Sequence, residues 1–342
     1  MPLSLNYLVR RVVWSLLVVV GVVVLSYLII ILSPGDPAVK WAGNPRGANA
    51  TLAIELARRE LGLQDPLYVQ IPRFIVSVLT GNLGLSIYYK QPVFTVIASN
   101  LASTLELLIV TYLIAIPVGV LLGYLSAMHR GSRIDDFLQQ LGVLLANTPT
   151  FWLGSALFLI LVTHQIPSSG RVEYALAIET GFQPVTGLYL LDSLIQGNFR
   201  VFADVLVRLL PPALAVSVYP MGLMIRVVRT LVTDVLLEDY IRVSVALGVG
   251  KRRILWTFTL RAVLPGVILL SGFAFADSLV DAIGVESVVF GRPGLGRLLM
   301  DALNSSDFRI AIGLIVVVTA FYLVVNTLAD AIQALADPRV RL

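Results

Sequence analysis

The stretch EDYIRVSVALGVGKRRILWTFTLRAVLP, from Glu238 to Pro265, is a polar, basic segment between two long apolar runs. It holds seven of the chain's 46 charged residues (25 basic and 21 acidic). The sequence is helix-prone over 234–247, is interrupted by the glycines of 248–250, and is helix-prone again over 251–264. A polar helix–turn–helix between apolar runs indicates a water-exposed loop that joins two membrane-spanning helices.

The composition indicates lipid as the solvent. Of the 342 residues, 57% are apolar and 13% are charged, whereas soluble domains carry about 25% charged residues. The net charge of +4 fits arginines beside a membrane and gives no indication of nucleic-acid binding. The chain has no cysteine, and its two histidines are isolated. Disulfides, thiol catalysis and a metal site are therefore not expected.

Apolar runs long enough to cross a membrane occur six times, since about 20 residues span the hydrocarbon as a helix. The first, Val12–Leu32, follows Arg10 and Arg11 and is longer than the roughly 7–15 residues of a signal-peptide core. It predicts a transmembrane helix that is retained. The predicted spans are 9–33, 104–127, 137–163, 205–232, 264–284 and 310–335.

Basic residues in the short polar segments predict the orientation. They occur at Arg10 and Arg11, in the loop 128–136, in the segment 233–264 and in the tail 337–342. With six spans, these four segments fall on one side, which the positive-inside rule assigns to the cytoplasm. We therefore expect a multi-pass protein of the cell membrane with both termini in the cytoplasm.

This topology predicts three parts. Residues 1–33 form an N-terminal cytoplasmic segment and the first transmembrane helix. Residues 34–103 form an extracellular region with surface helices, one of which is indicated by the helical spacing of TLAIELARRELG (51–62). Residues 104–342 form a core domain with five transmembrane helices and the loop 233–264.

The segment quoted first resembles the EAA loop of ABC-importer permeases. The similarity is to the dipeptide/oligopeptide/nickel branch, where this loop reads EDYVRTARAKG…RR…LRN…LLP. Ser244 and Leu247 stand where that branch commonly has Ala and Lys, and the spacing from Gly248 to Pro265 is about one residue shorter than usual in the branch. The matching residues are Glu238, Asp239, Tyr240, Arg242, Ala246, Gly248, Arg252, Arg253, Leu260, Arg261 and Pro265.

The resemblance extends, in order, along nearly the whole chain. Segments similar to the same branch include LGLQDPLYVQIPRFI (61–75), GNLGLSIYYKQPVFTVIASNLASTLEL (81–107), NTPTFWLG (147–154), LPPAL (210–214) and ESVVFGRPGLGRLLMDAL (286–303). It implies an all-α integral membrane protein with six transmembrane helices, in the type I ABC-importer permease fold. Such a subunit forms half of a translocation pathway for peptides or similar small solutes, oligosaccharides and nickel among them.

The resemblance also implies partners. They are a second homologous permease subunit, two ABC ATPase subunits and an extracellular substrate-binding protein, with membrane lipid around the complex. ATP and Mg²⁺ belong to the ATPase subunits, so no enzymatic activity and no cofactor are expected of this chain. Its own GVGKRR (248–253) lacks the Ser or Thr that follows the Lys of a phosphate-binding GxxxxGK[ST] loop.

The resemblance assigns contact with the ATPase to the EAA segment. The implied coupling residues are Glu238, Asp239, Tyr240, Arg242, Ala246, Gly248, Arg252 and Arg253. The alternative for this segment is an interfacial helix whose arginines contact anionic lipid headgroups.

Four acidic residues near or within the predicted spans are candidates for the translocation pathway. Asp277 and Asp281 are four residues apart and share a helix face. Acids within a membrane are costly and normally face water or the bundle interior; the alternative is that Asp281 lies at the outer interface. The branch commonly has small or apolar residues at both positions. Glu286 lies near the base of the turn 290–296, and Glu106 either lines the pathway or caps the start of a helix.

Two other functions remain open at this point. A secondary transporter would carry inverted repeats, yet the loop 233–264 has no counterpart elsewhere in the chain. A membrane scaffold protein without ATPase partners is equally compatible with the composition. A membrane enzyme is disfavoured, because no Ser/His or metal-binding constellation is present.

Overall fold

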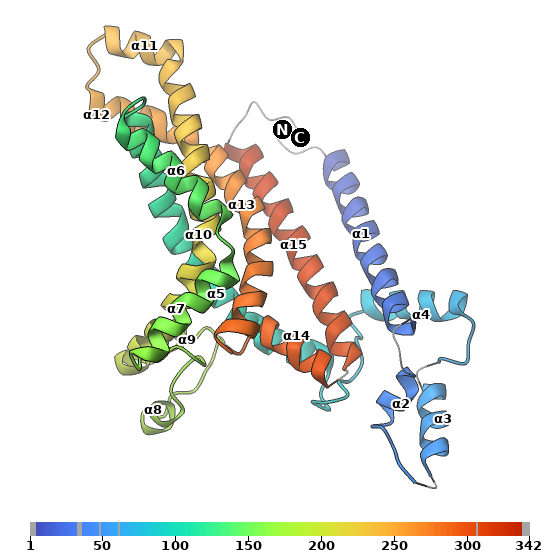
Figure 1. Cartoon of the computed structure of the whole chain (residues 1–342). Coiled ribbons are helices and arrows are strands. Elements are labelled where there is room, and N and C mark those ends of the chain that lie inside the picture. Colours follow the sequence, from blue (N-terminus) through green and yellow to red (C-terminus); the bar gives the residue numbers. More distant parts are fainter. Residues whose placement is uncertain (1–4, 33–35, 48, 61, 306, 337–342) are drawn as a thin grey trace. The chain divides into compact units, whose positions relative to one another are not determined.

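The computed structural model describes residues 5–32, 36–47, 49–60, 62–305 and 307–336, and their regular structure is helical (Figure 1). Arg339 and Arg341, part of the basis for the predicted orientation, lie outside the described residues. Contacts divide the described chain into two compact units. The core unit comprises 102–296 with 5–7 and 324–336, and the N-terminal unit comprises 8–101 with 297–323. The division at 33 and 103 stays a prediction.

The core unit is built on long apolar helices. They are α5 (Val93–Met128, from residue 102 onward), α10 (Phe199–Leu237), α13 (Leu260–Gly284) and the last part of α15 (Phe308–Ala336). Shorter helices complete it: α6 (Arg133–Asn147), α7 (Thr150–Thr163), α8 (Tyr174–Glu179), α9 (Tyr189–Ile195), α11 (Asp239–Ala246) and α12 (Lys251–Arg253). Two π-helical segments, η1 (Ile254–Thr259) and η2 (Val285–Val289), flank α13.

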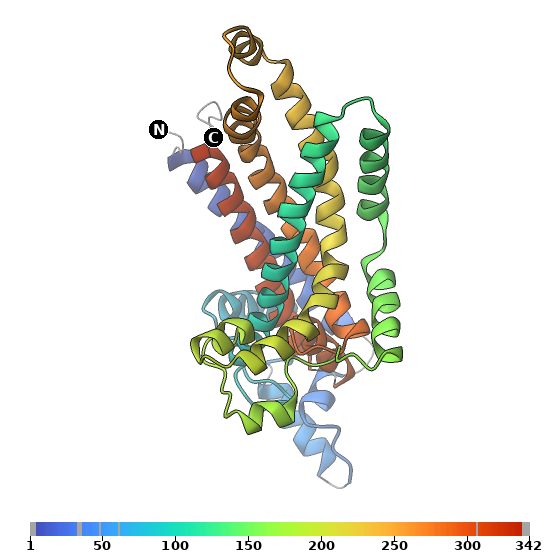
Figure 2. The same cartoon turned by 90° about the vertical axis from the view of Figure 1, so that its left-hand side faces the viewer.

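Helix α10 is the centre of this unit and packs against α6, α7 and α13 (Figure 2). Glycines allow the close approach of neighbouring backbones. A Cβ added to Gly222 of α10 would lie 2.6 Å from the carbonyl oxygen of Gly142 of α6, and one added to Gly123 of α5 would lie 2.7 Å from that of Ile225. Apolar side chains pack between α5, α10 and α13, among them Tyr124, Met224, Val228, Val232, Val263 and Val267.

The predicted third span, 137–163, is not one helix. Helices α6 and α7 meet at an angle of 92°. Thr148 has extended dihedral angles, φ −76° and ψ 122°, because the ring of Pro149 disfavours the helical conformation of the residue before it. At its other end α6 begins with a capping hydrogen bond from the Asp135 N–H to the Ser132 hydroxyl.

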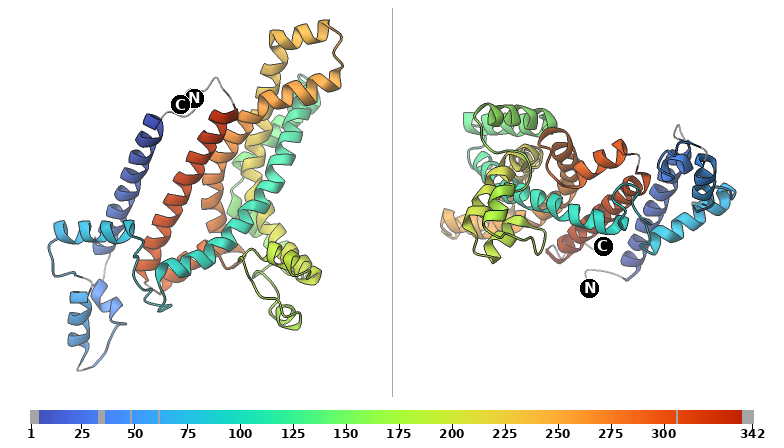
Figure 3. Two further views of the ribbon diagram at one scale, coloured as in Figure 1. Left: turned by 180° about the vertical axis from the view of Figure 1, so that it is seen from behind. Right: turned by 90° about the horizontal axis from the view of Figure 1, so that it is seen from below.

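The N-terminal unit holds α1 (Leu5–Leu32, from residue 8 onward), α2 (Pro37–Trp41), α3 (Ala50–Glu60), α4 (Leu67–Leu79) and α14 (Leu295–Asn304, from residue 297 onward). The first turns of α5 and the first part of α15 complete it. Helix α4 lies across the end of α1 (Figure 3). The buried apolar cluster of the N-terminal unit consists of Val23, Val78, Ile312 and Val316. The Asp307 carboxylate caps α15 by accepting a hydrogen bond from the N–H of Ile310, 3.2 Å.

Within the described residues, five helices are long and apolar enough to cross a membrane, and the count is six if the bent pair α6–α7 is one span. The boundaries differ from the predicted ones mainly by extension. Helix α5 begins at Val93, α10 runs from Phe199 to Leu237, and the span predicted at 264–284 covers Ile254–Val289. Prolines do not interrupt these helices, since Pro117, Pro220 and Pro265 lie inside continuous helices. At Pro265 this explains why the helix extends beyond the predicted start of the span.

Candidate functional site

The loop 233–264 contains the residues predicted to contact the ATPase and is called the coupling segment. It projects beyond the ends of α10 and α13 (Figure 3). The prediction of one helix over 234–247 is wrong at its start, because residues up to Leu237 continue α10. The break falls at Glu238, whose ψ of 144° is extended, and α11 begins at Asp239. An acidic residue in the first turn is favourable there, since the N-terminus of a helix carries partial positive charge.

Helix α11 ends in a two-bond glycine motif. The N–H of Gly248 donates to the carbonyl of Val245, and the N–H of Val249 donates to that of Ser244, both at 3.0 Å. Gly248 has φ +77°, a left-handed conformation that costs other residues free energy because of their Cβ. This bond pattern requires the glycine that the sequence places there.

All the predicted coupling residues are exposed in the isolated chain. In α11, Ile241 is the buried side chain, at 3% exposure, and it holds the helix against α10 and η1. Apolar side chains nearby are exposed as well, Leu247 at 78% and Val245 at 59%. Exposed apolar groups beside charged ones are typical of a surface that a partner protein covers.

The second half of the segment is continuous with a membrane span. We predicted a separate helix over 251–264, but α12, η1, α13 and η2 form one helical rod from Lys251 to Val289. Pro265 therefore lies inside this rod and does not end it. In η1 the Thr259 hydroxyl donates to the Ile254 carbonyl, 3.1 Å, and Trp256 stacks on Tyr124 of α5, with 5.9 Å between ring centroids. The segment 239–259 is thus joined to α10 on one side and to α13 on the other.

A charged cluster joins three helices at the same end of the core unit. Arg229 of α10 forms an ion pair with Asp135 of α6, Nη2 to Oδ2 at 2.8 Å. The same carboxylate accepts from the Ser126 hydroxyl of α5, 2.6 Å, and from the Gly131 N–H, 3.0 Å. The Asp135 side chain is 4% exposed. These contacts fix the loop 129–132 and brace α10 where the coupling segment begins.

Asp277 and Asp281 lie on one side of α13, as their spacing predicted. Asp277 is exposed and accepts a hydrogen bond from the Tyr219 hydroxyl of α10, 3.0 Å. Asp281 is half-buried and accepts from the Thr150 hydroxyl at the start of α7, 2.9 Å. Asp277 lies twelve residues before Val289, or about 18 Å along the helix at 1.5 Å per residue. Asp277 is therefore well inside the candidate span Ile254–Val289 and not at its end.

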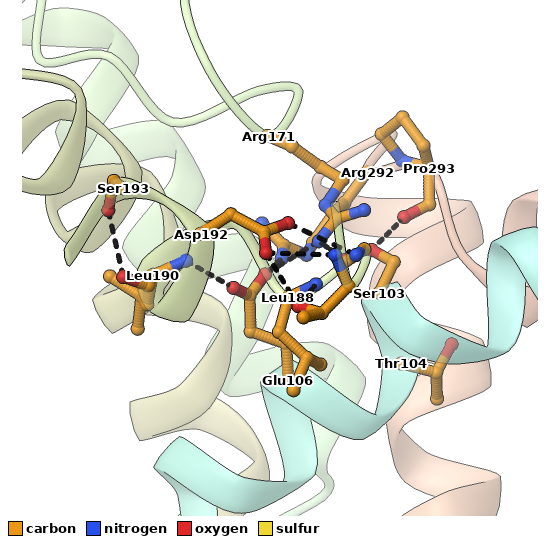
Figure 4. A network of polar contacts seen from close by, with 12 residues as sticks. Ser103, Thr104, Glu106, Arg171, Leu188, Leu190, Asp192, Ser193, Arg292 and Pro293 are labelled. Atoms are coloured by element: carbon orange, nitrogen blue, oxygen red, sulfur yellow. Dashed lines mark hydrogen bonds and ion pairs between the residues drawn. The ribbon is translucent and has the colours of Figure 1, made fainter. Parts of the chain in front are cut away.

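Glu106 takes part in a buried charge cluster at the opposite end of the core unit (Figure 4). Its Oε2 accepts from Arg171 at 2.9 Å and from Arg292 at 2.8 Å, and its Oε1 accepts from the N–H of Leu190, 2.7 Å. The Arg171 guanidinium also stacks on the Tyr189 ring, 3.6 Å from its centroid. Burial lowers the pKa of the Arg292 guanidinium to about 10, so it stays charged at neutral pH.

Glu286 lies beside this cluster and is fully buried. Its carboxylate accepts from the Thr104 hydroxyl, 2.8 Å, and from the N–H of Gly296, 3.2 Å. A Cβ added to Gly294 would overlap the Glu286 carboxylate. Glu106 and Glu286 therefore bind the turn 290–296 to α5, and a pathway role for either stays a prediction.

The structure adds residues that sequence reasoning did not select. Tyr219 and Thr150 partner the two aspartates, and Arg171 and Arg292 partner Glu106. The spacing of residues along the chain cannot reveal these pairs, because their members are far apart in sequence. Among the residues the structure describes, no group of three or more His, Asp or Glu side chains could hold a metal ion.

Comparison with known protein families decides what these features belong to. Residues 119–342 match the model of the binding-protein-dependent transport system inner membrane component, and residues 4–108 match the N-terminal model of such membrane components. The chain belongs to this family. The permease is therefore a multi-pass membrane protein and a subunit of an ABC importer, with the expected all-α type I fold.

Curated relatives agree over almost the full length. The chain is 36% identical over 337 residues to the probable D,D-dipeptide transport system permease protein DdpB of Escherichia coli (strain K12), covering 97% of each. It is 31% identical over 339 residues to the dipeptide transport system permease protein DppB of the same organism, covering 98% of this chain and 99% of the relative. The di/tripeptide transport system permease protein DppB of Pseudomonas aeruginosa (strain UCBPP-PA14) is 30% identical with the same coverage. Family membership thus favours the permease over a secondary transporter or a scaffold.

Proposed function

We propose that this permease imports peptides with energy supplied by separate ATPase subunits. The observation that carries the proposal is the exposed α11 segment, which continues into the two spans α10 and α13. The peptide class is supported by the relatives, whose names specify dipeptides and tripeptides. ATP and Mg²⁺ bind to the ATPase subunits in this proposal.

The proposed complex has one further permease subunit, two ATPases and a binding protein. The ATPases contact Glu238 to Gly248, with Arg252 and Arg253 at the rim of the contact. The arginine-rich end of the core unit supports this side as the cytoplasmic one, because α11 and α12, which lie there (Figure 1), carry Arg242, Arg252 and Arg253. The binding protein then docks at the opposite end, and both termini lie in the cytoplasm.

Copurification with transport measurement tests this assignment. The chain is tagged after Leu342, purified in mild detergent, and the bound chains are identified by mass spectrometry. We expect a second permease, an ATPase and a binding protein, and ATP-dependent peptide uptake after reconstitution into liposomes. A chain that purifies alone and moves peptides without ATP would overturn the proposal.

We further propose that Asp277 and Asp281 line the pathway and contact the ammonium group of a passing peptide. Facing Asp277 to lipid would cost roughly 2.5–3.5 kcal/mol on membrane-insertion scales, so its exposed side chain needs water or a partner subunit. Glu106 and Glu286 are saturated by contacts within the chain. We therefore assign them to the architecture of the outer end.

The test compares a free-amine dipeptide with its N-acetylated form. The Asp277→Asn/Asp281→Asn variant is expected to lose about tenfold in uptake of the free-amine peptide, and to lose the preference over the acetylated one. Glu179→Gln is the matched control, since that carboxylate is exposed and lies on the short helix α8. An unchanged preference in the double variant would show that the two aspartates do not contact the ammonium group.

A further inference from the structure

A pocket in the N-terminal unit lies where two membrane helices end. It is a cavity of about 280 Å³ lined by the end of α1, by α2 and α4, by the loop 82–87 and by the start of α15. Most of its wall is apolar, including Tyr27, Phe74 and Ile312. Its volume is near the lower end of the roughly 300–1,000 Å³ range of small-molecule pockets. The site is independent of the transport function proposed above.

One cation lines this pocket. The Arg309 guanidinium lies over the indole ring of Trp41, with its central carbon 3.9 Å from the ring centroid. Among the described residues, no carboxylate lies within ion-pair distance of this guanidinium, although Glu60 and Asp307 are in its neighbourhood. Both of these acids are already engaged, Glu60 by the Trp41 indole N–H at 3.0 Å and Asp307 by the Ser86 hydroxyl at 2.5 Å.

The pocket is built to hold this guanidinium in place. Gly84 has φ +78°, and a Cβ at that position would overlap Arg309 Nη1. The N–H of Gly84 is in turn held by the Asn82 side-chain oxygen, 3.2 Å. On the opposite wall the Tyr27 hydroxyl donates to Gln70, 2.6 Å, and the Tyr27 ring packs on Phe74, 4.9 Å between centroids. Nη1 of Arg309 lies against Gly84, and the guanidinium lines the cavity without a carboxylate at ion-pair distance among the described residues.

We propose that this pocket binds the phosphate of an anionic phospholipid, with the first carbons of the lipid against the apolar wall. A guanidinium presents paired N–H donors that match a phosphate. Trp and Tyr side chains at the ends of spans are typical of the headgroup level of a membrane. The volume suits a headgroup and excludes a folded partner. Arg309 therefore selects lipids without a headgroup cation, because such a cation would be repelled.

Native mass spectrometry of the purified full-length chain tests the site. Phosphatidylglycerol and phosphatidylcholine with identical acyl chains are titrated separately, and the retained lipid is counted. We expect phosphatidylglycerol to be retained at about tenfold lower concentration. Arg309→Gln is expected to abolish this preference. Arg297→Gln, which removes an exposed arginine paired with Asp301 in the same unit, is expected to keep it.

The remaining arms identify the source of the phosphate and guard against misfolding. Inorganic phosphate and glycerol phosphate should fail to displace the lipid at equal concentration; displacement by either would show a site for free phosphate and overturn the proposal. Equal loss of preference in both arginine variants would show unspecific charge attraction instead. If Arg309→Gln does not fold, hydrogen exchange of the wild-type chain decides. Phosphatidylglycerol must slow exchange in 82–88 relative to the loop 129–132 of the core unit, and no slowing would refute the site.

Discussion

Replacing Gly248 by valine separates strain within the chain from contact with a partner. An L-residue in the left-handed conformation costs about 1–2 kcal/mol, and a β-branched side chain lies at the upper end of such costs. No other atom of the described residues lies within 4 Å of an added Cβ at Gly248. The intrinsic effect of the substitution is therefore limited to this strain, which shifts a local equilibrium roughly 5- to 30-fold.

The docked state is expected to be far more sensitive. If α11 enters a groove of the ATPase, the valine side chain occupies space that the partner requires, and overpacking adds roughly 1–3 kcal/mol. The two costs together predict a loss of transport of at least a hundredfold. Binding of the substrate-binding protein should be unchanged, because it does not involve this end of the core unit.

The assay uses the reconstituted complex and a strain-matched control. Gly197 has φ +65° and equally open surroundings, but it lies in the turn before α10, at the end opposite to α11. ATP-dependent uptake and ATPase copurification are measured for Gly248→Val and Gly197→Val. We expect Gly248→Val to lose both ATP-dependent uptake and ATPase copurification, and Gly197→Val to keep both. If the two variants show the same transport, the strain of the left-handed conformation accounts for any loss, and the coupling role of Gly248 is wrong.

Three further predictions concern the core unit. Glu106→Gln removes the ion-pair partner of two buried arginines and should destabilise the protein by about 3–5 kcal/mol, measured as a fall in melting temperature in detergent against Glu179→Gln. Gly222→Ala should also lower the melting temperature, by about 1–3 kcal/mol of overpacking, because the added Cβ would lie 2.5 Å from the Ala146 nitrogen; unchanged melting would refute the close α6–α10 contact. The segment 183–197 should lose protection from hydrogen exchange below about pH 4. Burial alone would raise the pKa of Asp192, but hydrogen bonds from Thr186 and the neighbouring N–H groups lower it below the ordinary value. The stabilisation that the Asp192 carboxylate gives to this segment is full above about pH 3.9, the ordinary pKa of an aspartate. It is lost as the pH falls through the lower pKa of the folded state, and Asp192→Asn should lack this pH dependence.

The sequence was informative where a signal is local. Apolar run length located the spans, and the glycines of 248–250 located the end of α11, although the predicted start at Asp234 was wrong. The errors have local physical causes as well. Pro149 divides an apolar run that length alone assigned to one span, and Pro265 was taken as an end although neighbouring helices tolerate it.

Long-range pairing is what the sequence did not reveal. Glu106 was selected as acidic and close to a span, but its partners Arg171 and Arg292 lie 65 and 186 residues away. Charges in outer loops are usually solvated, so their sequence offers no sign that two guanidinium groups are buried. The same applies to Arg309, whose partner ring is contributed by a helix near the other end of the chain.

The distribution of strong and weak contacts along α13 suggests where the core unit rearranges. Beyond one end, the turn after η2 is fixed by the buried ion pairs of Glu106, which are costly to break. At the other end, Lys251 to Thr259 join α13 to the exposed helix α11. Between them, Asp277 meets α10 through one exposed hydrogen bond from Tyr219, worth only about 0.5–1.5 kcal/mol or somewhat more for a charged acceptor. If an ATPase displaces α11 as proposed, we therefore expect α13 to shift against α10 near Asp277 more readily than at the anchored turn 290–296. This is the arrangement required if ATPase movement is to alter the pathway without dismantling the surface that receives the substrate.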